Sequence, residues 1–392
     1  IHVVGTNGKG SFCRMLSSIL TAAGYKTGLF TSPYIETFNE RMQIDGANIT
    51  NDELAAITGY VKGFADTMAD PPTEFELINA VGFEYFRRNR CDVVVLEAGL
   101  GGRLDSTNEI PCPVLSVVTG IDYDHMAILG DTLPKIAAEK AGIIKPGTTV
   151  LFGEGAPEAE VVIRETTDRI CGAQAYHRTD YSRIALAETS LDGTAFTFAP
   201  FGKLRLSMCG MYQLRNAANV LTAVELLRDK GYKIPDDAVR DGLASAKWKA
   251  RFEVLSRDPI IVYDGAHNPQ GIAASEANIR QYLAPLTPDG KIHLLMGVLA
   301  DKDYRTMIAA LAPYAKSVVT ITPPSPRALD AADTAAIFRE HGVSAVPAKS
   351  VDAGVTMAVD GAKQDHVPLF ILGSLYLYGA VKESLSAYRN EL

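Results

Sequence analysis

The sequence predicts an α/β protein in which two domains are each built around a mostly parallel sheet. Short apolar strands alternate with amphipathic helical patterns along most of the 392 residues, an order that is typical of βαβ units. The stretch Ile184–Met208 instead alternates polar and apolar residues around a turn at Leu191–Thr194, which predicts a small antiparallel patch. A fresh βα series starts after Trp248, so we place the domain boundary between residues 248 and 249.

Apolar runs rich in β-branched residues predict the strands, and periodic amphipathic stretches predict the helices. In the first domain the strands are His2–Val4, Thr27–Phe30, Val93–Leu96, Val114–Thr119 and Thr149–Phe152, and the helices are Gly10–Ala23 and Ala217–Lys230. In the second domain the strands are Ile260–Tyr263, Ile292–Met296, Val318–Thr322 and Leu369–Leu372, and the helices are Gly271–Tyr282, Tyr304–Leu311 and Leu375–Tyr388. Continuous apolar runs such as DVVVLE suit parallel strands that are buried on both faces.

The composition excludes several classes of protein. Hydrophobic residues make up 47% and charged residues 21% of the chain, which excludes a collagen-like or largely disordered protein. There are 38 Lys and Arg against 46 Asp and Glu, a net charge of −8. We therefore expect no nucleic-acid partner, because such a partner needs a basic surface. The longest apolar stretch, Val367–Val381, is short and interrupted, so we expect no membrane partner.

The cysteines indicate a reducing compartment. Their number, five, is odd and no C-x-x-C spacing occurs, so neither a disulfide scaffold nor a zinc ribbon is expected. No signal peptide is visible, which favours a cytoplasmic location. The chain starts at Ile1, inside a predicted strand, which indicates that a further segment precedes it in the whole protein.

The clearest chemical signal is the glycine-rich segment GTNGKGS at residues 5–11. It follows a strand and opens a helix, so its backbone N–H groups and the positive end of the helix dipole would face an anion. Lys9 would reach the phosphates, and the hydroxyl of Ser11 follows it. The first two glycines are closer together than in the common phosphate-loop pattern, and a further glycine precedes the serine. The alternative is a glycine-rich turn without a ligand, but lysine and serine in this context favour phosphate binding.

Three polar side chains follow other predicted strands of the first domain. Glu97 ends the run DVVVLE, His125 follows a second strand, and Ser32 closes a third. Since the carboxyl ends of parallel strands meet at one edge of a sheet, we expect these side chains beside the phosphate loop. A carboxylate, an imidazole and a hydroxyl there can hold magnesium or manganese. The alternatives are a salt-bridged strand end for Glu97, a turn donor for His125 and a helix cap for Ser32.

The second domain has one comparable signal, the segment YDGAHNP at residues 263–269. It lies between a predicted strand and a predicted helix, again at the carboxyl end of a parallel strand. Asp264 is a candidate to bind a ribose hydroxyl or an amine, and His267 is a candidate to orient a substrate. The alternative is an Asp–Gly turn followed by a capping Asn268. A site that uses both halves is expected in the cleft between them.

Five motifs in sequence order carry a resemblance to a known family: GTNGKGS, TSPYIETFNERM, EAGLGGRLDSTN, DHMAILGDTLPKIAAEKAGIIKPG and DGAHNP. The chain resembles the folylpolyglutamate synthase/dihydrofolate synthase family, within the Mur ligase superfamily, from Gly5 to Tyr376. The resemblance implies a Mur-type P-loop ATPase domain over residues 1–248, followed by a C-terminal Rossmann-like glutamate-ligase domain over residues 249–392.

The resemblance also implies a role for individual residues. It implies phosphate contacts from Gly8, Lys9, Gly10 and Ser11, and nucleotide contacts from Asn216, Arg251 and Asp264. It implies a magnesium set of Ser32, Glu97 and His125, and potassium is an additional candidate ion. Lys140 matches a lysine that family members carry as a carbamate, which turns a cation into an anion that reaches a second metal.

Two further sets follow from the same resemblance. Segments near the pterin are implied at Thr73, Glu74, Phe75, Glu76, Leu104, Asp105 and Ser106, and positions linked to glutamate at His267, Ser374 and Tyr376. The residues expected to act in catalysis are Lys9, Lys140, Arg251 and His267. Two positions depart from the family pattern, because Gly265 stands where alanine is frequent and Ala250 stands where glycine is usual.

The implied reaction is ATP-dependent attachment of L-glutamate to dihydropteroate, to folate or to both. The acceptor carboxylate would first become an acyl phosphate, and the glutamate amine would then displace phosphate. We expect a monomer whose partners are these small molecules. The alternatives are another Mur-type amino-acid ligase and an ATP-binding relative that has lost catalysis.

Overall fold

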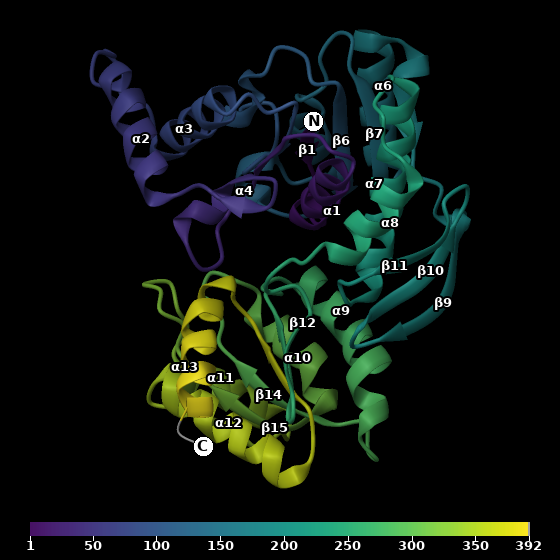
Figure 1. The fold of residues 1–392 in the computed structure, drawn as a ribbon. Helices are drawn as coiled ribbons and strands as arrows, with labels where there is room; N and C mark the ends of the chain where they lie inside the picture. The colour runs from purple at the N-terminus through teal and green to yellow at the C-terminus, as the bar shows by residue number, and fades with distance from the viewer. Residues whose placement is uncertain (391–392) are drawn as a thin grey trace. The chain divides into compact units, whose positions relative to one another are not determined.

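The computed structural model describes residues 1–390 and confirms the α/β class (Figure 1). The chain forms two compact units. Unit 1 contains Ile1–Ala187, Ala195–Ser207 and Gln213–Lys247. Unit 2 contains Glu188–Thr194, Met208–Tyr212 and the chain from Trp248 onward.

Unit 1 is organised around a sheet in which the described residues form eight strands in the order β4-β3-β2-β5-β1-β6-β7-β8. The strands are β1 (His2–Val4), β2 (Thr27–Phe30), β3 (Met42–Ile44), β4 (Ala47–Asn48), β5 (Val93–Glu97), β6 (Leu115–Ile121), β7 (Thr149–Gly155) and β8 (Tyr176–Arg178). The six neighbouring strands β2, β5, β1, β6, β7 and β8 run parallel. At one edge of the sheet β3 pairs antiparallel with β2, and β4 pairs antiparallel with β3. All the strands predicted here from sequence are present.

The helices of unit 1 pack on this sheet and on one another. They are α1 (Lys9–Ala22), α2 (Asn51–Ala65), α3 (Glu74–Arg88), α4 (Met126–Leu129), α5 (Leu133–Ala141), α6 (Pro157–Cys171), α7 (Met211–Asp229) and α8 (Asp236–Ser245). Side chains of α5 and α6 form one apolar core with β1, β6 and β7, and side chains of α2 and α3 form another with β2, β3 and β5. Burial of these apolar stripes is the main source of stability for such helices.

The predicted antiparallel patch is present as a three-stranded sheet in the order β11-β10-β9. Its strands are β9 (Ile184–Ser190), β10 (Gly193–Phe198) and β11 (Gly202–Leu206). Leu191 and Asp192 form the two-residue connection between the first two strands, and Gly193 follows with φ +123°. A two-residue turn of this kind sets the register of a hairpin.

Unit 2 contains a second sheet in which the described residues form six strands in the order β12-β13-β17-β14-β15-β16. The strands are β12 (Glu253–Arg257), β13 (Ile260–Asp264), β14 (Ile292–Met296), β15 (Ala315–Thr320), β16 (Ala345–Pro347) and β17 (Leu369–Leu372). β12 is antiparallel to β13, and the other neighbours run parallel.

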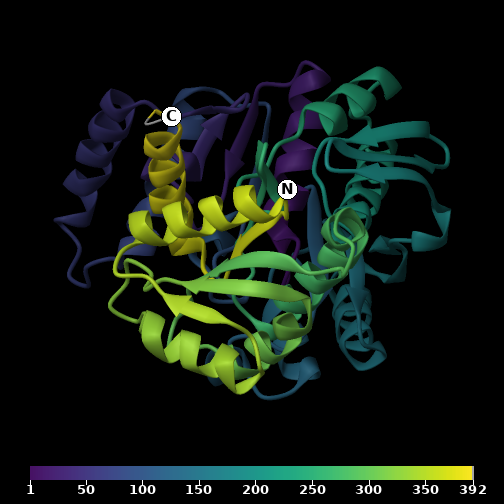
Figure 2. The same cartoon turned by 90° about the horizontal axis from the view of Figure 1, so that it is seen from below.

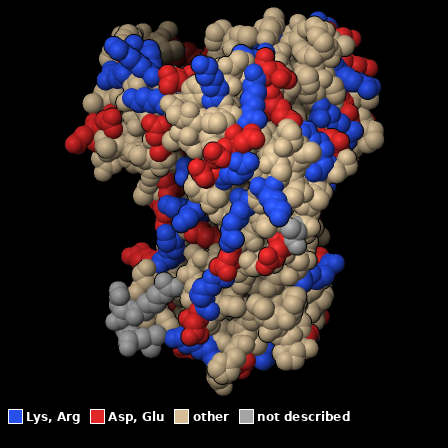
Figure 3. Space-filling model, turned by 45° about the vertical axis from the view of Figure 1, so that its right-hand side comes forward, with Lys and Arg blue, Asp and Glu red and all other residues tan. Residues whose placement is uncertain are grey.

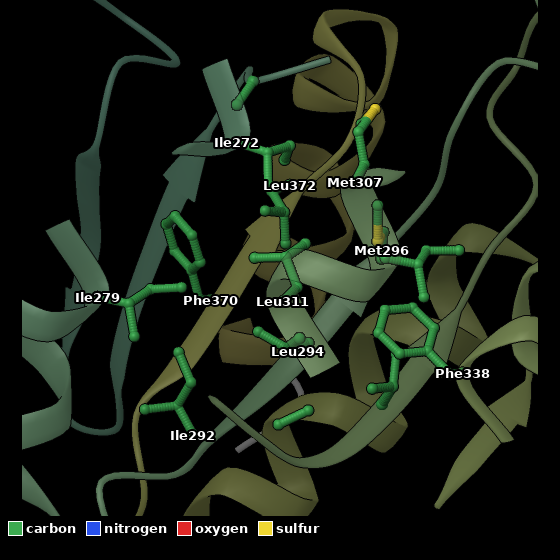
Figure 4. Packing of buried hydrophobic residues seen from close by; sticks show 14 of the residues in the cluster. Ile272, Ile279, Ile292, Leu294, Met296, Met307, Leu311, Phe338, Phe370 and Leu372 are labelled. Carbon is green, nitrogen blue, oxygen red and sulfur yellow. The ribbon is translucent and has the colours of Figure 1, made fainter. Parts of the chain in front are cut away.

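Helices cover both faces of this second sheet (Figure 2). They are α9 (Pro269–Asn278), α10 (Tyr304–Leu311), α11 (Ala331–Glu340), α12 (Val351–Asp365) and α13 (Tyr378–Asn390). Leu294 and Met296 of β14 belong to the core formed with α9, α10 and α11 (Figure 4). Leu295 and His293 instead lie against glycines of α12. This alternation is what a strand buried on both faces requires.

Several element boundaries differ from the sequence prediction; α7, for example, begins at Met211 and not at Ala217, and β7 extends to Gly155 rather than ending at Phe152. The strand predicted at Val318–Thr322 is β15 (Ala315–Thr320), which ends at Thr320, where its pairing with β14 and β16 also ends. The helix predicted over Gly271–Tyr282 is α-helical only to Asn278 and continues as a π-helical turn. The helix predicted from Leu375 begins with a 3₁₀ turn before α13.

The surface carries charges of both signs. Acidic and basic side chains are interspersed over the face that Figure 3 shows. Within residues 1–390, none of the helices combines the length and the apolar character that crossing a membrane would require.

Candidate functional site

The phosphate loop lies at the centre of the parallel sheet of unit 1. It follows β1, whose Val3 is paired with Glu97 of β5 on one side and with Val117 of β6 on the other. β1 therefore lies where the strand order reverses, with β5 and β2 on one side and β6, β7 and β8 on the other. Ligands of parallel sheets bind at such a point, beyond the carboxyl ends of the strands. Thr6 N donates to Gly120 O at 2.8 Å, which joins the loop to β6.

Two glycines of this loop have no room for a side chain. Gly8 is the N-cap of α1 with φ +84°, and a Cβ there would lie 2.5 Å from Asn216 Oδ1. A Cβ on Gly5 would lie 2.0 Å from Thr119 Oγ1. Thr119 Oγ1 also donates to Asn7 O at 2.7 Å. The loop is therefore held against its neighbours with its backbone N–H groups at the start of α1, the arrangement that binds phosphate.

Lys9 and Ser11 lie in the first turn of α1. Lys9 Nζ donates to Gly5 O at 2.9 Å and to Thr6 O at 3.3 Å, so its charge is held over the loop. Ser11 is buried and its Oγ accepts from Gln213 Nε2 at 3.2 Å. Gln213 Oε1 in turn accepts from Asn216 Nδ2 at 2.9 Å. These bonds join the predicted phosphate residues to the predicted nucleotide residue.

A hydrogen bond joins Ser32 and Glu97, whereas the contact that the structure gives His125 is with its neighbour Asp124. Ser32 N donates to Glu97 Oε2 at 3.2 Å, and Glu97 is buried at the end of β5. A hydroxyl and a carboxylate are ligands that magnesium accepts, so this pair fits the ion. The exposed ring of His125 has Nε2 3.7 Å from Asp124 Oδ2. Among the described residues no group of three or more His, Cys, Asp or Glu is placed to hold a metal.

Lys140 is a buried lysine in the last turn of α5. Only 3% of it is exposed, and burial, followed by the charge of Lys9, lowers the pKa of its ammonium from 10.5 to about 7. Asp124 opposes this lowering. The side chain therefore lies in the same electrostatic environment as Lys9 and Asp124. Near neutral pH a large fraction of Lys140 is an uncharged amine, the form that reacts with carbon dioxide.

The two segments implied for the pterin are joined by a residue that the sequence analysis did not single out. Buried Asn79 donates through Nδ2 to Phe75 O at 2.8 Å and also to Ser106 Oγ. Asp105 Oδ2 accepts from Leu100 N at 2.7 Å, which closes the second segment. Leu104 is 79% exposed beside it.

Thr73 and Glu76 have a structural role in the same region. They form a capping box at the start of α3, in which Thr73 Oγ1 accepts from Glu76 N and Glu76 Oε2 accepts from Thr73 N at 2.7 Å. Such a cap stabilises a helix terminus by about 1 kcal/mol. Glu74 is exposed in the first turn, and the ring of Phe75 packs against Gly99.

In unit 2, Asp264 is the buried carboxylate at the end of β13. Burial raises its pKa to about 6. The charge of Arg251 and hydrogen bonds, among them one donated by Ala266 N at 3.0 Å, act in the opposite direction and lower the pKa. Tyr212 lies with its hydroxyl 3.5 Å from Asp264 Oδ2. Arg251 lies between Ala250 and Phe252, which have φ +55° and +47°. Position 250, where the family usually has glycine and this chain has alanine, therefore has a left-handed backbone, which glycine adopts more easily than other residues.

The three residues predicted to bind glutamate lie near the carboxyl ends of β13 and β17. These strands are neighbours, with Asp264 paired to Leu372, and Ser374 follows β17 after Gly373. Ser374 Oγ accepts from Tyr376 N at 3.2 Å. Tyr376 is 56% exposed. His267 Nδ1 is 2.7 Å from Gly265 O. Since a carbonyl only accepts, Nδ1 carries the proton and Nε2 is the basic nitrogen.

The alternative interpretation of residues 263–269, in which Asn268 caps the following helix, is confirmed for Asn268. Asn268 is the N-cap of α9, and its Oδ1 accepts from Gly271 N at 2.7 Å. A Cβ on Gly265 would lie 2.1 Å from a methyl group of Leu375. Alanine at position 265 would therefore require Leu375 to move.

The sequence analysis also assigned no role to Gln213 and Arg41. Arg41 lies in the motif TSPYIETFNERM and Gln213 lies three residues before Asn216, but nothing in the spacing alone shows that Gln213 contacts Ser11 or that Arg41 contacts Ser32. For Gln213 the sequence offers no signal beyond a polar residue near Asn216 on the same helix. For Arg41 the available signal is a cation that follows two aromatic residues, Tyr34 and Phe38, in one motif.

Comparison with known proteins matches both units to one family. The Mur ligase middle domain matches residues 3–224, and the Mur ligase glutamate ligase domain matches residues 250–374. The dihydrofolate synthase/folylpolyglutamate synthase of Bacillus subtilis is 36% identical over 98% of this chain and 90% of its own length. The folylpolyglutamate synthase of Lacticaseibacillus casei is 36% identical over 98% of this chain and 89% of its own.

Solved structures give the same result. Mycobacterium tuberculosis folylpolyglutamate synthase, in a study of complexes with ADP and AMPPCP, has a TM-score of 0.86 and 31% identity over 98% of this chain and 90% of its own. Escherichia coli FolC in complex with DHPP and ADP has a TM-score of 0.83 and 31% identity over 99% of this chain and 88% of its own.

Proposed function

The chain belongs to the folylpolyglutamate synthase/dihydrofolate synthase family of Mur ligases, and from that membership we propose how its residues perform the reaction. It is an ATP-dependent ligase that activates a pterin or folate carboxylate and joins it to L-glutamate. We propose that it accepts both dihydropteroate and reduced folate. We also propose that residues 1–248 form the ATP-binding domain and residues 249–392 the glutamate-ligase domain.

One observation supports the ATP-binding role most strongly. Lys9 over the loop, Glu97 at the neighbouring strand end and buried Lys140 lie around the start of α1, at the carboxyl edge of the sheet. Gly8, Lys9, Gly10 and Ser11 would bind the phosphates, because backbone N–H groups at a helix start attract anions. Asn216, Arg251 and Asp264 would contact the rest of the nucleotide.

The reaction proceeds in two displacements. An oxygen of the acceptor carboxylate bonds to the γ-phosphorus of ATP, the bond from that phosphorus to the β–γ bridging oxygen breaks, and ADP leaves. The uncharged amino nitrogen of glutamate then bonds to the acyl carbon, and the bond to the phosphate oxygen breaks. Phosphate leaves, and the nitrogen gives up a proton. Lys9 and Arg251 would neutralise phosphoryl charge, and His267 Nε2 would accept a proton from the glutamate ammonium.

Two groups from outside the chain fit unit 1. Magnesium would be held by Glu97 and Ser32, with Ser11 nearby in the loop and His125 as the further predicted ligand, and it supplies charge neutralisation for phosphoryl transfer. Potassium is a further candidate ion. A carbamate on Lys140 fits because burial leaves its amine largely uncharged near neutral pH. The carbamate would replace a cation with an anion close to Lys9.

The acceptor and glutamate would be bound by different units. Thr73, Glu74, Phe75, Glu76, Leu104, Asp105 and Ser106 of unit 1 would bind the pterin side. His267, Ser374 and Tyr376 of unit 2 would bind glutamate. We also propose that the enzyme is a cytoplasmic monomer, which agrees with the five cysteines being free thiols.

A coupled phosphate-release assay tests this proposal. Mg-ATP and glutamate are offered with dihydropteroate or reduced folate, and products are identified by mass. Turnover with both acceptors is expected. Turnover with one alone assigns a single activity, and turnover only with another acid assigns a different Mur-type ligase. Nucleotide binding without phosphate release from any acceptor identifies a catalytically silent relative.

Lys9→Ala tests the phosphate-loop assignment. It should lower turnover at least ~1,000-fold, because it removes a cation from the phosphates, while the circular dichroism spectrum and melting temperature stay close to wild type. Retained turnover would reject the assignment. Lys135→Ala is a matched control, since Lys135 is an exposed lysine paired with Asp131 on α5.

A further inference from the structure

Arg41 is a half-buried cation beside the Ser32–Glu97 pair. Its Nη1 donates to Ser32 Oγ at 2.9 Å, and its guanidinium lies over the rings of Tyr34 and Phe38, 5.3 and 5.6 Å from their centroids. Its Nε is buried and has no hydrogen-bond partner among the described residues. A buried donor without a partner costs free energy. This atom therefore indicates that a ligand completes the site.

The segment that presents Arg41 is firmly built. Thr31 N donates to Arg41 O at 3.0 Å, which closes residues 31–41 into a loop. Inside the loop, buried Glu40 accepts through Oε2 from Ile35 N at 2.9 Å and from Glu36 N at 3.1 Å. The guanidinium is thus held in place before any ligand arrives, which lowers the entropy cost of binding.

We propose that Arg41 binds the carboxylate of the pterin acceptor that is to be activated, an assignment that rests on the proposed function. Nη1 is occupied by Ser32, so the Nε–Nη2 edge is left to grip a carboxylate with two parallel hydrogen bonds. Tyr34 covers this guanidinium and is 44% exposed, so its ring can move aside without disturbing the core.

The chemistry requires a cation of this kind. An acceptor carboxylate and a triphosphate repel each other, and their approach needs a positive charge between them. Lys9 is bonded to loop carbonyls, and burial lowers the pKa of Lys140. Burial also lowers the pKa of Arg41, yet a guanidinium stays protonated in proteins. Arg41 is therefore the fully charged donor beside Ser32 and Glu97.

Binding of two matched ligands tests the proposal without depending on turnover. Dihydropteroate and its carboxamide analogue, which lacks the negative charge, are titrated into the full chain by calorimetry in the presence of Mg-ADP. The wild type should prefer the acid by roughly 10- to 100-fold, the range of a charge-assisted hydrogen bond. Arg41→Gln should lower that preference to below about threefold, and Arg41→Lys should leave it between the two.

Controls separate this role from a structural one. Arg183→Lys and Arg183→Gln alter another arginine of unit 1 that lies over a ring, Phe198, but is paired with Glu225. These variants should keep the wild-type preference for the acid. In steady-state assays Arg41→Gln should raise the KM for the acceptor at least about tenfold and change the KM for ATP less than about twofold.

The outcomes are distinguishable. If Arg41→Gln keeps the full preference for the acid, or if both KM values rise together, the assignment of Arg41 is wrong while the proposed function stands. If the wild type binds neither the acid nor the carboxamide, the proposed function itself fails.

Discussion

The polar edges of the two parallel sheets differ in how they manage backbone conformation and buried charge. In the phosphate loop of unit 1 the residues with positive φ are glycines, Gly5 and Gly8, whereas the segment of unit 2 that carries Arg251 has positive φ at Ala250 and Phe252. Each edge also contains a buried ionisable group whose pKa burial shifts, Lys140 in unit 1 and Asp264 in unit 2. Burial lowers the pKa of Lys140 to about 7 and raises the pKa of Asp264 to about 6.

This difference shows what each edge is built to do. Glycine is required where backbone must approach an anion closely, and at Gly8 there is no space for a Cβ. The segment around Arg251 presents a side chain rather than backbone, and its left-handed positions are occupied by residues with side chains, Ala250 and Phe252. Burial favours the uncharged form in both units, which makes a reactive amine of Lys140 and makes Asp264 easier to protonate than an ordinary carboxyl.

Gly8→Ala should have the largest effect, because it places a side chain in the phosphate loop, where the backbone has to approach an anion closely. The new methyl would meet Asn216 Oδ1 and force a left-handed backbone on alanine, so we expect ATP-dependent turnover to fall ~100-fold or more. Steady-state kinetics measures this. Gly24→Ala is the control, because Gly24 has φ +91° but nothing within 4 Å of a Cβ. An equal loss in both variants would attribute the effect to backbone strain alone.

Lys140→Met should separate stability from activity. A pKa lowered in the folded state means that the unfolded chain binds more protons between about pH 7 and 10.5, so the stability of the wild type rises with pH across that window. Replacing the buried ammonium should add roughly 2–4 kcal/mol to the free energy of unfolding near pH 7 and abolish turnover.

Urea unfolding of Lys140→Met at several pH values, in buffer depleted of carbon dioxide, checks the stability part. Mass measurement of the native wild type in bicarbonate should show one added carbamate, which the variant cannot form. A variant that is active, or that keeps the wild-type pH dependence of stability, contradicts the role given to Lys140.

Asp264→Asn should have a smaller effect of opposite pH dependence. The pKa of Asp264 is raised from 3.8 to about 6, so the folded state binds more protons in that window and wild-type stability falls as pH rises through it. In the asparagine variant the decrease in the free energy of unfolding across this pH window should be smaller than in the wild type by about 1–3 kcal/mol. Unfolding curves from pH 4 to 7 measure it. An unchanged slope would show that Asp264 titrates normally.

Ala250→Gly should have the smallest effect. Glycine relieves about 1–2 kcal/mol of left-handed strain but loses a buried methyl group, so the net change in unfolding free energy should be within about 1 kcal/mol. Ala246→Gly removes an equally buried methyl at φ −63° and should cost more. Thermal unfolding compares the two, and equal losses would mean that residue 250 is not strained.

Local patterns were sufficient for most of the fold. The central strands of both sheets and the hairpin turn at Leu191–Asp192 followed from periodicity and turn residues, because these depend on neighbours in sequence, whereas the short outer strands β3, β4, β8, β12 and β16 were not predicted. Several amphipathic helices, among them α2, α3 and α6, were not predicted, although capping residues such as Thr73 mark one of them. Exact ends, such as the end of β15, depended on which strands pair.

The sequence by itself determined the phosphate loop, the polar strand ends and the family, since these are written in the order and spacing of residues such as Lys9, Glu97 and Asp264. Tertiary structure alone decided that Gln213 supports Ser11, that Asn79 joins the two segments proposed to bind the pterin, and that Arg41 lies beside Ser32 with no partner for its Nε among the described residues. The physical reason is that hydrogen bonds and pKa values depend on distance and burial, and both are set by segments that are far apart in the chain.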